Sequence, residues 1–331
     1  IKSHQRNDDH VSGAEKTGAQ SEIIEQEIKE MTNFDYYAPT KVVFGKGTED
    51  QAGDLVREQG ATKVLVHYGS GSVKRSGLLE RIYQSLEQAG IPFVSLGGVV
   101  PNPRLSLVYQ GIELCKKEHV DFILAVGGGS VIDSGKAIGY GVANEGDVWD
   151  FYERKRVAAG CLPIGVVLTI AAAGSEMSNS SVITNEDGWL KRGYGNDCCR
   201  ARFAVMNPEL TMTLPKYQTA SGCVDIMMHT MERYFNQEEN LDLTDGFSEH
   251  LIRTVMENAR ILMKEPDNYK ARAEVMWAGS LSHNGLTGCG TAGGDWASHQ
   301  LEHELGGMFD VAHGAGLSAV WGSWARYVLE G

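Results

Sequence analysis

Between residues 40 and 206 the chain alternates short β-branched runs with longer amphipathic stretches, and this alternation constrains the fold more than any other feature. Strands separated by helix-length segments predict an α/β domain with a largely parallel sheet. Helices are expected at residues 78–89 and 107–118. Strands are expected at residues 42–44, 63–68, 93–96, 122–126, 163–168 and 203–206.

After Pro215 the strand signal ends. Residues 216–265 and 270–305 carry helical periodicity with few β-branched runs, which predicts a helical domain. We therefore expect an α/β domain over residues 31–215 and an all-helical domain over residues 216–331. The polar residues 1–30 are expected to be a disordered extension. The sequence stops within the apolar, helix-like residues 319–329, so the helical domain is expected to be incomplete.

The composition excludes several classes of function. A net charge of −13 argues against binding to nucleic acid or to an anionic membrane surface, both of which favour basic patches. We see no apolar run long enough to span a membrane and no signal-peptide pattern. The six cysteines show no zinc-type CxxC spacing, which favours free thiols in a reducing compartment. The composition thus predicts a cytoplasmic enzyme.

Small residues follow several of the expected strands. The strand at residues 122–126 leads into the glycine-rich run 127–136, and the strand at 63–68 leads into residues 69–74. Glycines at such positions let backbone amides approach a pyrophosphate, whose charge the following helix N-terminus favours. Neither run is a G-x-G-x-x-G or Walker A sequence, and each alone could be an ordinary turn. A third polar loop at residues 169–176 strengthens the prediction of a nucleotide crevice.

The end of the second strand bears on the choice of nucleotide. No acidic residue stands there to hold a ribose 2′-hydroxyl, as NAD-binding sites often require. Ser70, Ser72 and Lys74 could instead tolerate a 2′-phosphate. This favours NADP slightly, without excluding NAD.

Histidines and a carboxylate recur at helical spacing in the second half. Asp225 and His229 lie four residues apart, as do His299 and His303, and His313 follows in a loop. Residues four apart share one helical face, so each pair can aim two ligand atoms at one point. Carboxylate oxygen and imidazole nitrogen suit Zn²⁺ or Fe²⁺ with an open position for substrate. His250 and His283 have no such partner and are expected to be structural.

One competing motif overlaps this cluster. His299-Gln-Leu-Glu302-His303 matches H-x-x-E-H, in which both histidines bind zinc and the glutamate activates water in certain metallopeptidases. A five-residue match arises by chance fairly often, and a peptidase would leave the nucleotide-like half unexplained. The peptidase is the alternative from another class of enzyme.

With these motifs in place, the sequence resembles the iron-containing (group III) alcohol dehydrogenases, most closely the butanol dehydrogenase branch that reduces aldehydes. The resemblance runs from about residue 32 to residue 331. It rests on Asn102 in a Pro-Asn-Pro turn and on residues 127–136, 174–176, 207–215, 225–234 and 299–314.

The resemblance implies a dehydroquinate-synthase-like fold and NAD(P)H-dependent interconversion of primary alcohols and aldehydes by a homodimer. It implies Asp225, His229, His299 and His313 as the metal ligands, with His303 near the substrate as a proton relay. It implies that the following residues line the dinucleotide: Gly69, Ser70, Ser72, Asn102, Gly128, Gly129, Ser130, Asp133, Thr169, Ala172 and Lys191.

Two departures and two further alternatives accompany the resemblance. Family members usually carry Thr where this chain has Ala173, and they continue for some tens of residues beyond Gly331. A dehydroquinate-synthase-like lyase would share the architecture, but it recycles its cofactor rather than consuming NADPH. An inactive remnant is the non-catalytic alternative.

Overall fold

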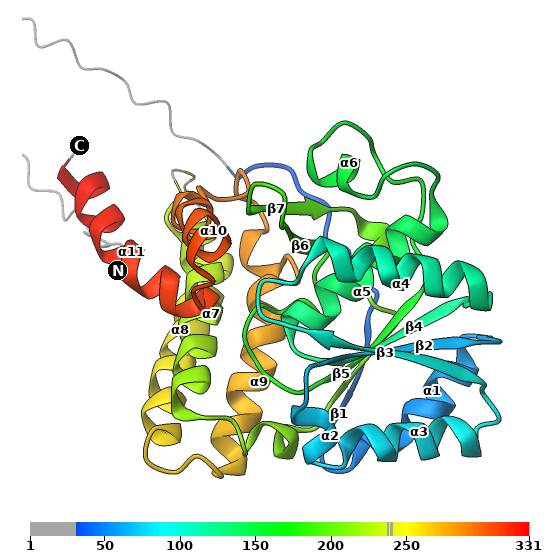
Figure 1. Cartoon of the computed structure of the whole chain (residues 1–331). Coiled ribbons are helices and arrows are strands. Elements are labelled where there is room, and N and C mark those ends of the chain that lie inside the picture. The colour runs from blue at the N-terminus through cyan, green and yellow to red at the C-terminus, as the bar shows by residue number, and fades with distance from the viewer. Residues whose placement is uncertain (1–30, 237, 239–240, 331) are drawn as a thin grey trace, which may run out of the picture.

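The computed structural model describes residues 31–236, 238 and 241–330, so the predicted extension at residues 1–30 lies outside the described residues. A six-stranded sheet lies beside a group of long helices (Figure 1). The last strand ends at Met206 and the first long helix of the second half begins at Lys216. The predicted fold class is confirmed, while the exact domain limits stay a prediction.

All six predicted strands are present and pair in parallel, in the order β1-β8-β5-β4-β2-β3. The observed strand ends differ from the predicted ones by at most three residues. The strands are β1 (Lys41–Phe44), β2 (Val64–Gly69), β3 (Phe93–Val99), β4 (Phe122–Gly127), β5 (Ile164–Leu168) and β8 (Phe203–Met206).

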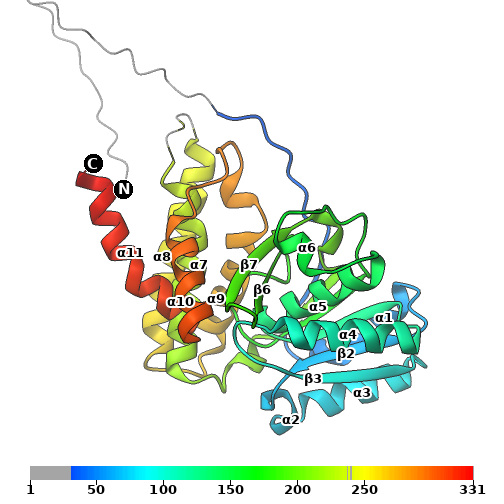
Figure 2. The same cartoon turned by 45° about the horizontal axis from the view of Figure 1, so that its top comes forward.

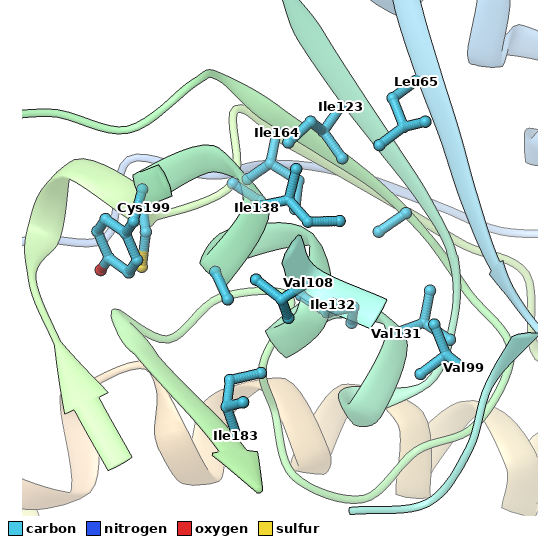
Figure 3. Packing of buried hydrophobic residues seen from close by; sticks show 14 of the residues in the cluster. Leu65, Val99, Val108, Ile123, Val131, Ile132, Ile138, Ile164, Ile183 and Cys199 are labelled. Atoms are coloured by element: carbon cyan, nitrogen blue, oxygen red, sulfur yellow. The ribbon is translucent and has the colours of Figure 1, made fainter. Parts of the chain in front are cut away.

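Helices cover both faces of this sheet, which explains why its central strands are apolar throughout. One face packs on α1 (Ala52–Glu58) and α3 (Leu78–Gln88). The other packs on α4 (Leu105–Glu118) and α5 (Gly129–Ala143) (Figure 1). Figure 3 shows this second core layer, where Ile123 and Ile164 from the strands meet Val108 of α4 and Ile138 of α5.

The strand order places a crevice between β2 and β4. From β2 the chain moves outward to β3, and from β4 it moves in the opposite direction to β5. Loops leaving neighbouring strands in opposite directions open a ligand crevice at the carboxyl ends of those strands. Both glycine-rich runs singled out in the sequence leave β2 and β4 here. The first leads into the short helix α2 (Ser72–Arg75) and the second into α5.

A two-stranded antiparallel sheet was not predicted. β6 (Ser180–Asn185) pairs with β7 (Leu190–Gly195) beside the main sheet. Its strands are only partly buried, and β7 carries no β-branched residue, so the alternation signal is weak. The Asp187-Gly188 dipeptide between them, with Gly188 at φ 83°, is a hairpin signal that could have revealed it. A further single-turn helix, α6 (Trp149–Tyr152), precedes this hairpin.

In the described part of the second half, five long helices pack on one another, and α10 also lies against β7. The prediction of helix through residues 270–305 is wrong in its middle part. The intervening segment contains four glycines with positive φ, at positions 285, 290, 293 and 294, which stop the helix. The helices are α7 (Lys216–Tyr234), α8 (Asp242–Leu262), α9 (Tyr269–His283), α10 (Ala297–Phe309) and α11 (His313–Glu330). Among the described residues, no helix is long and apolar enough to cross a membrane.

The helical half faces the open edge of the crevice. In both views α7, α9 and α10 stand next to the hairpin β6–β7 and the loops that follow the sheet (Figures 1 and 2). Residues from both halves can therefore line one site.

Candidate metal and nucleotide site

Three side chains from two helices converge in the helical half. Asp225 and His229 lie one turn apart on α7, and His299 comes from the first turn of α10. One ligand atom from each lies within 4.8 Å of the others, and all three residues are buried. The i,i+4 pair predicted on α7 is therefore joined by one member of the second pair.

Hydrogen bonds orient both imidazoles. The Nδ1 atom of His229 donates to the carbonyl oxygen of Asp225, 2.9 Å away. The Nδ1 atom of His299 donates to Oε1 of Glu232 at 2.9 Å, and the His299 backbone amide donates to the same oxygen at 3.1 Å. Each bond fixes the tautomer that leaves Nε2 unprotonated, as metal-binding histidines require.

Two atoms at the centre of the cluster have no hydrogen-bond partner among the described residues. They are Nε2 of His299 and Oδ1 of Asp225, both buried. The Asp225 oxygen lies 3.0 Å from Nδ1 of His229, whose proton is already donated to the Asp225 carbonyl oxygen. Nε2 of His313 lies 3.6 Å from that Asp225 oxygen. Orphaned buried polar atoms are costly and call for a reason. One carboxylate oxygen with imidazole nitrogens is a donor set that fits Fe²⁺ or Zn²⁺.

The electrostatics favour deprotonated ligands. Burial raises the pKa of Asp225, but the neighbouring His313 and His229 outweigh it, so the pKa is lowered overall. Burial and the adjacent histidines hold the pKa of His299 well below its usual value. Burial raises the pKa of Glu232 to about 6. A neutral imidazole and an ionised aspartate are the forms that bind a cation.

The geometry argues against the metallopeptidase alternative. Glu302 is fully buried, and its Oε2 accepts hydrogen bonds from Nζ of Lys191 at 2.9 Å and from Nδ1 of His313. Its Oε2 is therefore engaged, and its Oε1 is buried without a hydrogen-bond partner among the described residues. His303 lies outside the Asp225–His229–His299 cluster, with its ring 5.9 Å from that of His313. Burial and the charge of Lys191 hold its pKa well below the usual value.

A single cavity of about 1040 Å³ joins the two halves. Its helical wall includes Asp225, His229, His299, His303 and His313. Its other wall is formed by the strand ends and the hairpin, with all the residues predicted to line the dinucleotide: Gly69, Ser70, Ser72, Asn102, Gly128, Gly129, Ser130, Asp133, Thr169, Ala172 and Lys191. The structure thus brings together every candidate site residue. Lys74 is not part of the lining, and its ammonium lies 5.1 Å from the centre of the Tyr68 ring.

The glycine-rich strand end is closely fitted. A Cβ atom on Gly128 would lie 2.1 Å from Cγ2 of Ile170, so a side chain at position 128 would force Ile170 or its loop to move. α5 begins at Gly129, which directs its first backbone amides at the crevice. Asp133, one turn further, accepts from Ser175 Oγ at 2.5 Å and from the Val182 amide at 3.0 Å. Its carboxylate therefore ties α5 to the loop after β5 and to the hairpin.

The sequence analysis gave no role to Glu232, expected His283 to be structural, and gave Glu302 a role only in the peptidase alternative. In the structure Glu232 and Glu302 accept hydrogen bonds from His299 and His313, and His283 lines the cavity with its ring 4.1 Å from that of His229. Arg233 donates to Nδ1 of His283 from another helix, so the search for a partner within one helix could not find it. The sequence did contain an indication for Glu232, because it follows Asp225 by seven residues and therefore lies on the same face of α7.

Comparisons with known proteins agree with this geometry. Residues 39–208 match the family model described as iron-containing alcohol dehydrogenase. Residues 219–330 match the model described as the C-terminal part of the Fe-containing alcohol dehydrogenase family.

Individual relatives are similar over most of the chain. NADH-dependent butanol dehydrogenase A of Clostridium acetobutylicum is 44% identical, over 91% of this chain and 77% of that protein. The NADPH-dependent aldehyde reductase YqhD of Escherichia coli is 38% identical, over 88% of this chain and 74% of that protein. The crystal structure of NADH-dependent butanol dehydrogenase A from Thermotoga maritima superposes with a TM-score of 0.90 at 41% identity, covering 91% of this chain and 76% of that one.

Proposed function

The chain belongs to the iron-containing alcohol dehydrogenase family, in its butanol dehydrogenase branch, and on that premise we propose that it interconverts primary alcohols and aldehydes such as butanol and butanal. As a member it is an NAD(P)H-dependent oxidoreductase. One observation carries the proposal. A single cavity has amide-rich strand ends on one wall and a buried carboxylate–histidine cluster on the other, so a nicotinamide and a metal-held substrate can meet in it.

We propose Asp225, His229, His299 and His313 as the ligands of one divalent metal, Fe²⁺ or Zn²⁺. When bound, the metal would polarise the carbonyl oxygen as a Lewis acid and the nicotinamide would supply the hydride. The orphaned Oδ1 of Asp225 and Nε2 of His299 support this assignment. Glu232 would keep the His299 imidazole turned toward the metal through its hydrogen bond to Nδ1.

His303 is the proposed proton relay. The oxygen of the substrate gains a proton on reduction and loses one on oxidation, so a group that exchanges protons with solvent is needed. His303 lines the cavity, with its ring 5.9 Å from that of His313, so it lies where it could pass a proton between the substrate and solvent. In His303→Gln, turnover should fall and the pH dependence of kcat should change. An unchanged pH profile would contradict the relay.

The nucleotide would lie along the strand-end wall. Its pyrophosphate would meet the amides of Gly128, Gly129 and Ser130 at the start of α5. Ser70 and Ser72 line the cavity at the end of β2, where no acidic side chain stands to reject a 2′-phosphate. On this ground we propose a slight preference for NADP with NAD also accepted.

The other enzymatic alternatives have less support. A dehydroquinate-synthase-like lyase shares the architecture, but no observation favours it over the family's alcohol and aldehyde chemistry.

We further propose that the protein acts in the cytoplasm as a homodimer, as the composition and the resemblance suggest.

The test is butanal-dependent oxidation of NADPH and of NADH, followed at 340 nm on metal-reconstituted protein with a chelated sample alongside. We expect turnover that chelation abolishes. Nucleotide oxidation that continues unchanged after complete metal removal would contradict the metal-dependent mechanism. Sustained net oxidation of NAD(P)H would also separate this activity from that of the lyase, which recycles its cofactor.

A further inference from the structure

Glu302 occupies an unusual position between the two halves of the site. It lies on α10, in the middle of the H-x-x-E-H motif, and none of its surface is exposed. Its Oε2 accepts from both Nζ of Lys191, at 2.9 Å, and Nδ1 of His313. One oxygen atom thus joins a lysine from the hairpin strand β7 to a histidine at the start of α11.

The two partners belong to different parts of the proposed site. Lys191 comes from the α/β half and lines the nucleotide wall, whereas His313 comes from the helical half and is a proposed metal ligand. The side chains of Lys191 and Glu302 are 5% and 0% exposed, so water contributes little to this ion pair. Breaking one side of such a buried pair leaves an uncompensated charge, which is strongly unfavourable.

Glu302 is closely packed against two glycines. A Cβ atom on Gly316 would lie 2.7 Å from Cγ of Glu302, and one on Gly306 would lie 3.0 Å from its Oε1. The same Gly306 Cβ would lie 2.7 Å from Nζ of Lys191. Two glycines therefore leave the space that the ion pair fills, and the carboxylate has little freedom to move.

The hydrogen bond to His313 has a direct consequence for the metal cluster. With Nδ1 of His313 donating to Glu302, Nε2 is the free nitrogen, and it lies 3.6 Å from Oδ1 of Asp225. Carboxylates that hold the far nitrogen of a metal-binding histidine fix its tautomer and its ring orientation. Glu232 does the same for His299, but its partners all belong to the helical half.

We propose that Glu302 is a positioning residue for both ligands of the enzyme: it orients His313 toward the metal and holds Lys191 against the nucleotide. The inference rests on the proposed function and goes beyond it, because it makes metal binding and nucleotide binding depend on one carboxylate. Glu232, by contrast, positions a metal ligand alone. The two glutamates are therefore a matched pair.

The experiment compares Glu302→Gln, Glu232→Gln and, as a control, Glu257→Gln at an exposed site on α8. Metal-free protein is titrated with Co²⁺, whose visible absorption reports ligand geometry, and separately with NADPH by its fluorescence. Thermal unfolding of each variant verifies that it is folded. These readouts require no turnover.

We expect Glu302→Gln to raise the Kd for Co²⁺ about 10-fold to 100-fold and to alter the absorption spectrum. It should also raise the Kd for NADPH about fivefold or more, because Lys191 loses its charged partner. Glu232→Gln should raise only the Co²⁺ Kd, and Glu257→Gln should change neither. Should Glu302→Gln fail to fold, Lys191→Met serves instead, and should raise the NADPH Kd, because the side chain that Glu302 holds is then missing from the nucleotide wall.

Two results would overturn the inference. One is a Glu302→Gln protein that binds both probes like the wild type, and the other is a rise confined to one of them. For Lys191→Met, an unchanged NADPH Kd would overturn it. Failure of the proposed function looks different: Asp225→Asn would then bind Co²⁺ as tightly as the wild type, showing that the metal lies elsewhere.

Discussion

The two halves of the molecule build their shares of the cavity by opposite means. On the α/β side, glycines and small residues stand at the ends of β2 and β4, where backbone amides can face a ligand. On the helical side the wall is made of large ionisable side chains that α7, α10 and α11 bring together. The α/β wall can accept a phosphate because the small residues there leave the backbone amides accessible. The helical wall can hold a cation because atoms without partners converge there.

This difference has a consequence for mutation. The α/β wall should be sensitive to added volume, since its function depends on close approach of a ligand to amides. The helical wall should be sensitive to removal of single polar atoms.

Removing one ligand oxygen from the helical wall should have the largest effect. Asp225→Asn keeps the size of the side chain but removes its charge and one anionic donor from the cluster. We expect kcat/KM to fall about 10³-fold or more, because polarisation of the carbonyl depends on the metal. Bound metal, measured by atomic emission after dialysis, should fall in parallel, while the Kd for NADPH should change less than about twofold.

The control for this change is Asp242→Asn, at an exposed site in the first turn of α8. It should retain full metal content and activity. An Asp225→Asn enzyme that keeps its metal, or one that loses nucleotide affinity to the same degree, would break the separation between the two walls.

Buried histidines, three of which line the helical wall, should also make stability depend on pH. Burial lowers the pKa of His67 in β2 to about 4, and it holds the pKa values of His283, His299 and His303 well below the usual range. Such groups stay neutral when folded but take up protons near pH 6.5 when unfolded. Unfolding is therefore favoured as pH falls through about 6.5, and the stabilisation is fully present only above it.

We expect the free energy of unfolding of metal-free protein to fall by about 2 kcal/mol between pH 8 and pH 6. The raised pKa of Glu232, about 6, offsets a small part of this loss, because its folded form gains protons first. Urea unfolding at several pH values measures the slope. His283→Gln should flatten it, whereas His250→Gln, at an exposed site on α8, should not. Equal slopes in these two variants would show that His283 is not a buried neutral group.

The same contrast explains how far sequence alone could go. Local patterns predicted the strands. The i,i+4 spacing of Asp225 and His229 predicted the first two members of the metal cluster, because residues one helical turn apart lie on the same face. Glu302 could not be assigned in this way. Its partner Lys191 lies 111 residues away on a hairpin that was itself missed, and only the packing of α10 on β7 brings them together. The H-x-x-E-H match therefore suggested a catalytic glutamate where the fold has an ion pair.

The glycine-rich strand end illustrates the opposite case. Its sequence predicted a close approach of backbone to ligand, and the structure supplies the reason that a side chain is excluded. A Cβ atom on Gly128 would meet Ile170 of the facing loop at 2.1 Å. The pattern could not reveal which residue stands behind the glycine, because residue 170 follows another strand.

The smallest predicted effects therefore come from adding one methyl group. Gly128→Ala should destabilise the fold by about 1–3 kcal/mol, because Ile170 or its loop must shift. The Kd for NADPH should rise as well, since the amides of Gly129 and Ser130 move too.

The matched change is Gly246→Ala in α8, where a Cβ atom meets nothing within 4 Å. It should stabilise the protein by about 0.5–1 kcal/mol, because alanine has less backbone freedom to lose in a helix. Urea unfolding and NADPH titration of both variants make the comparison. If the two substitutions change stability and nucleotide binding equally, the end of β4 is not sensitive to added volume, and the proposed difference between the α/β wall and the helical wall is wrong.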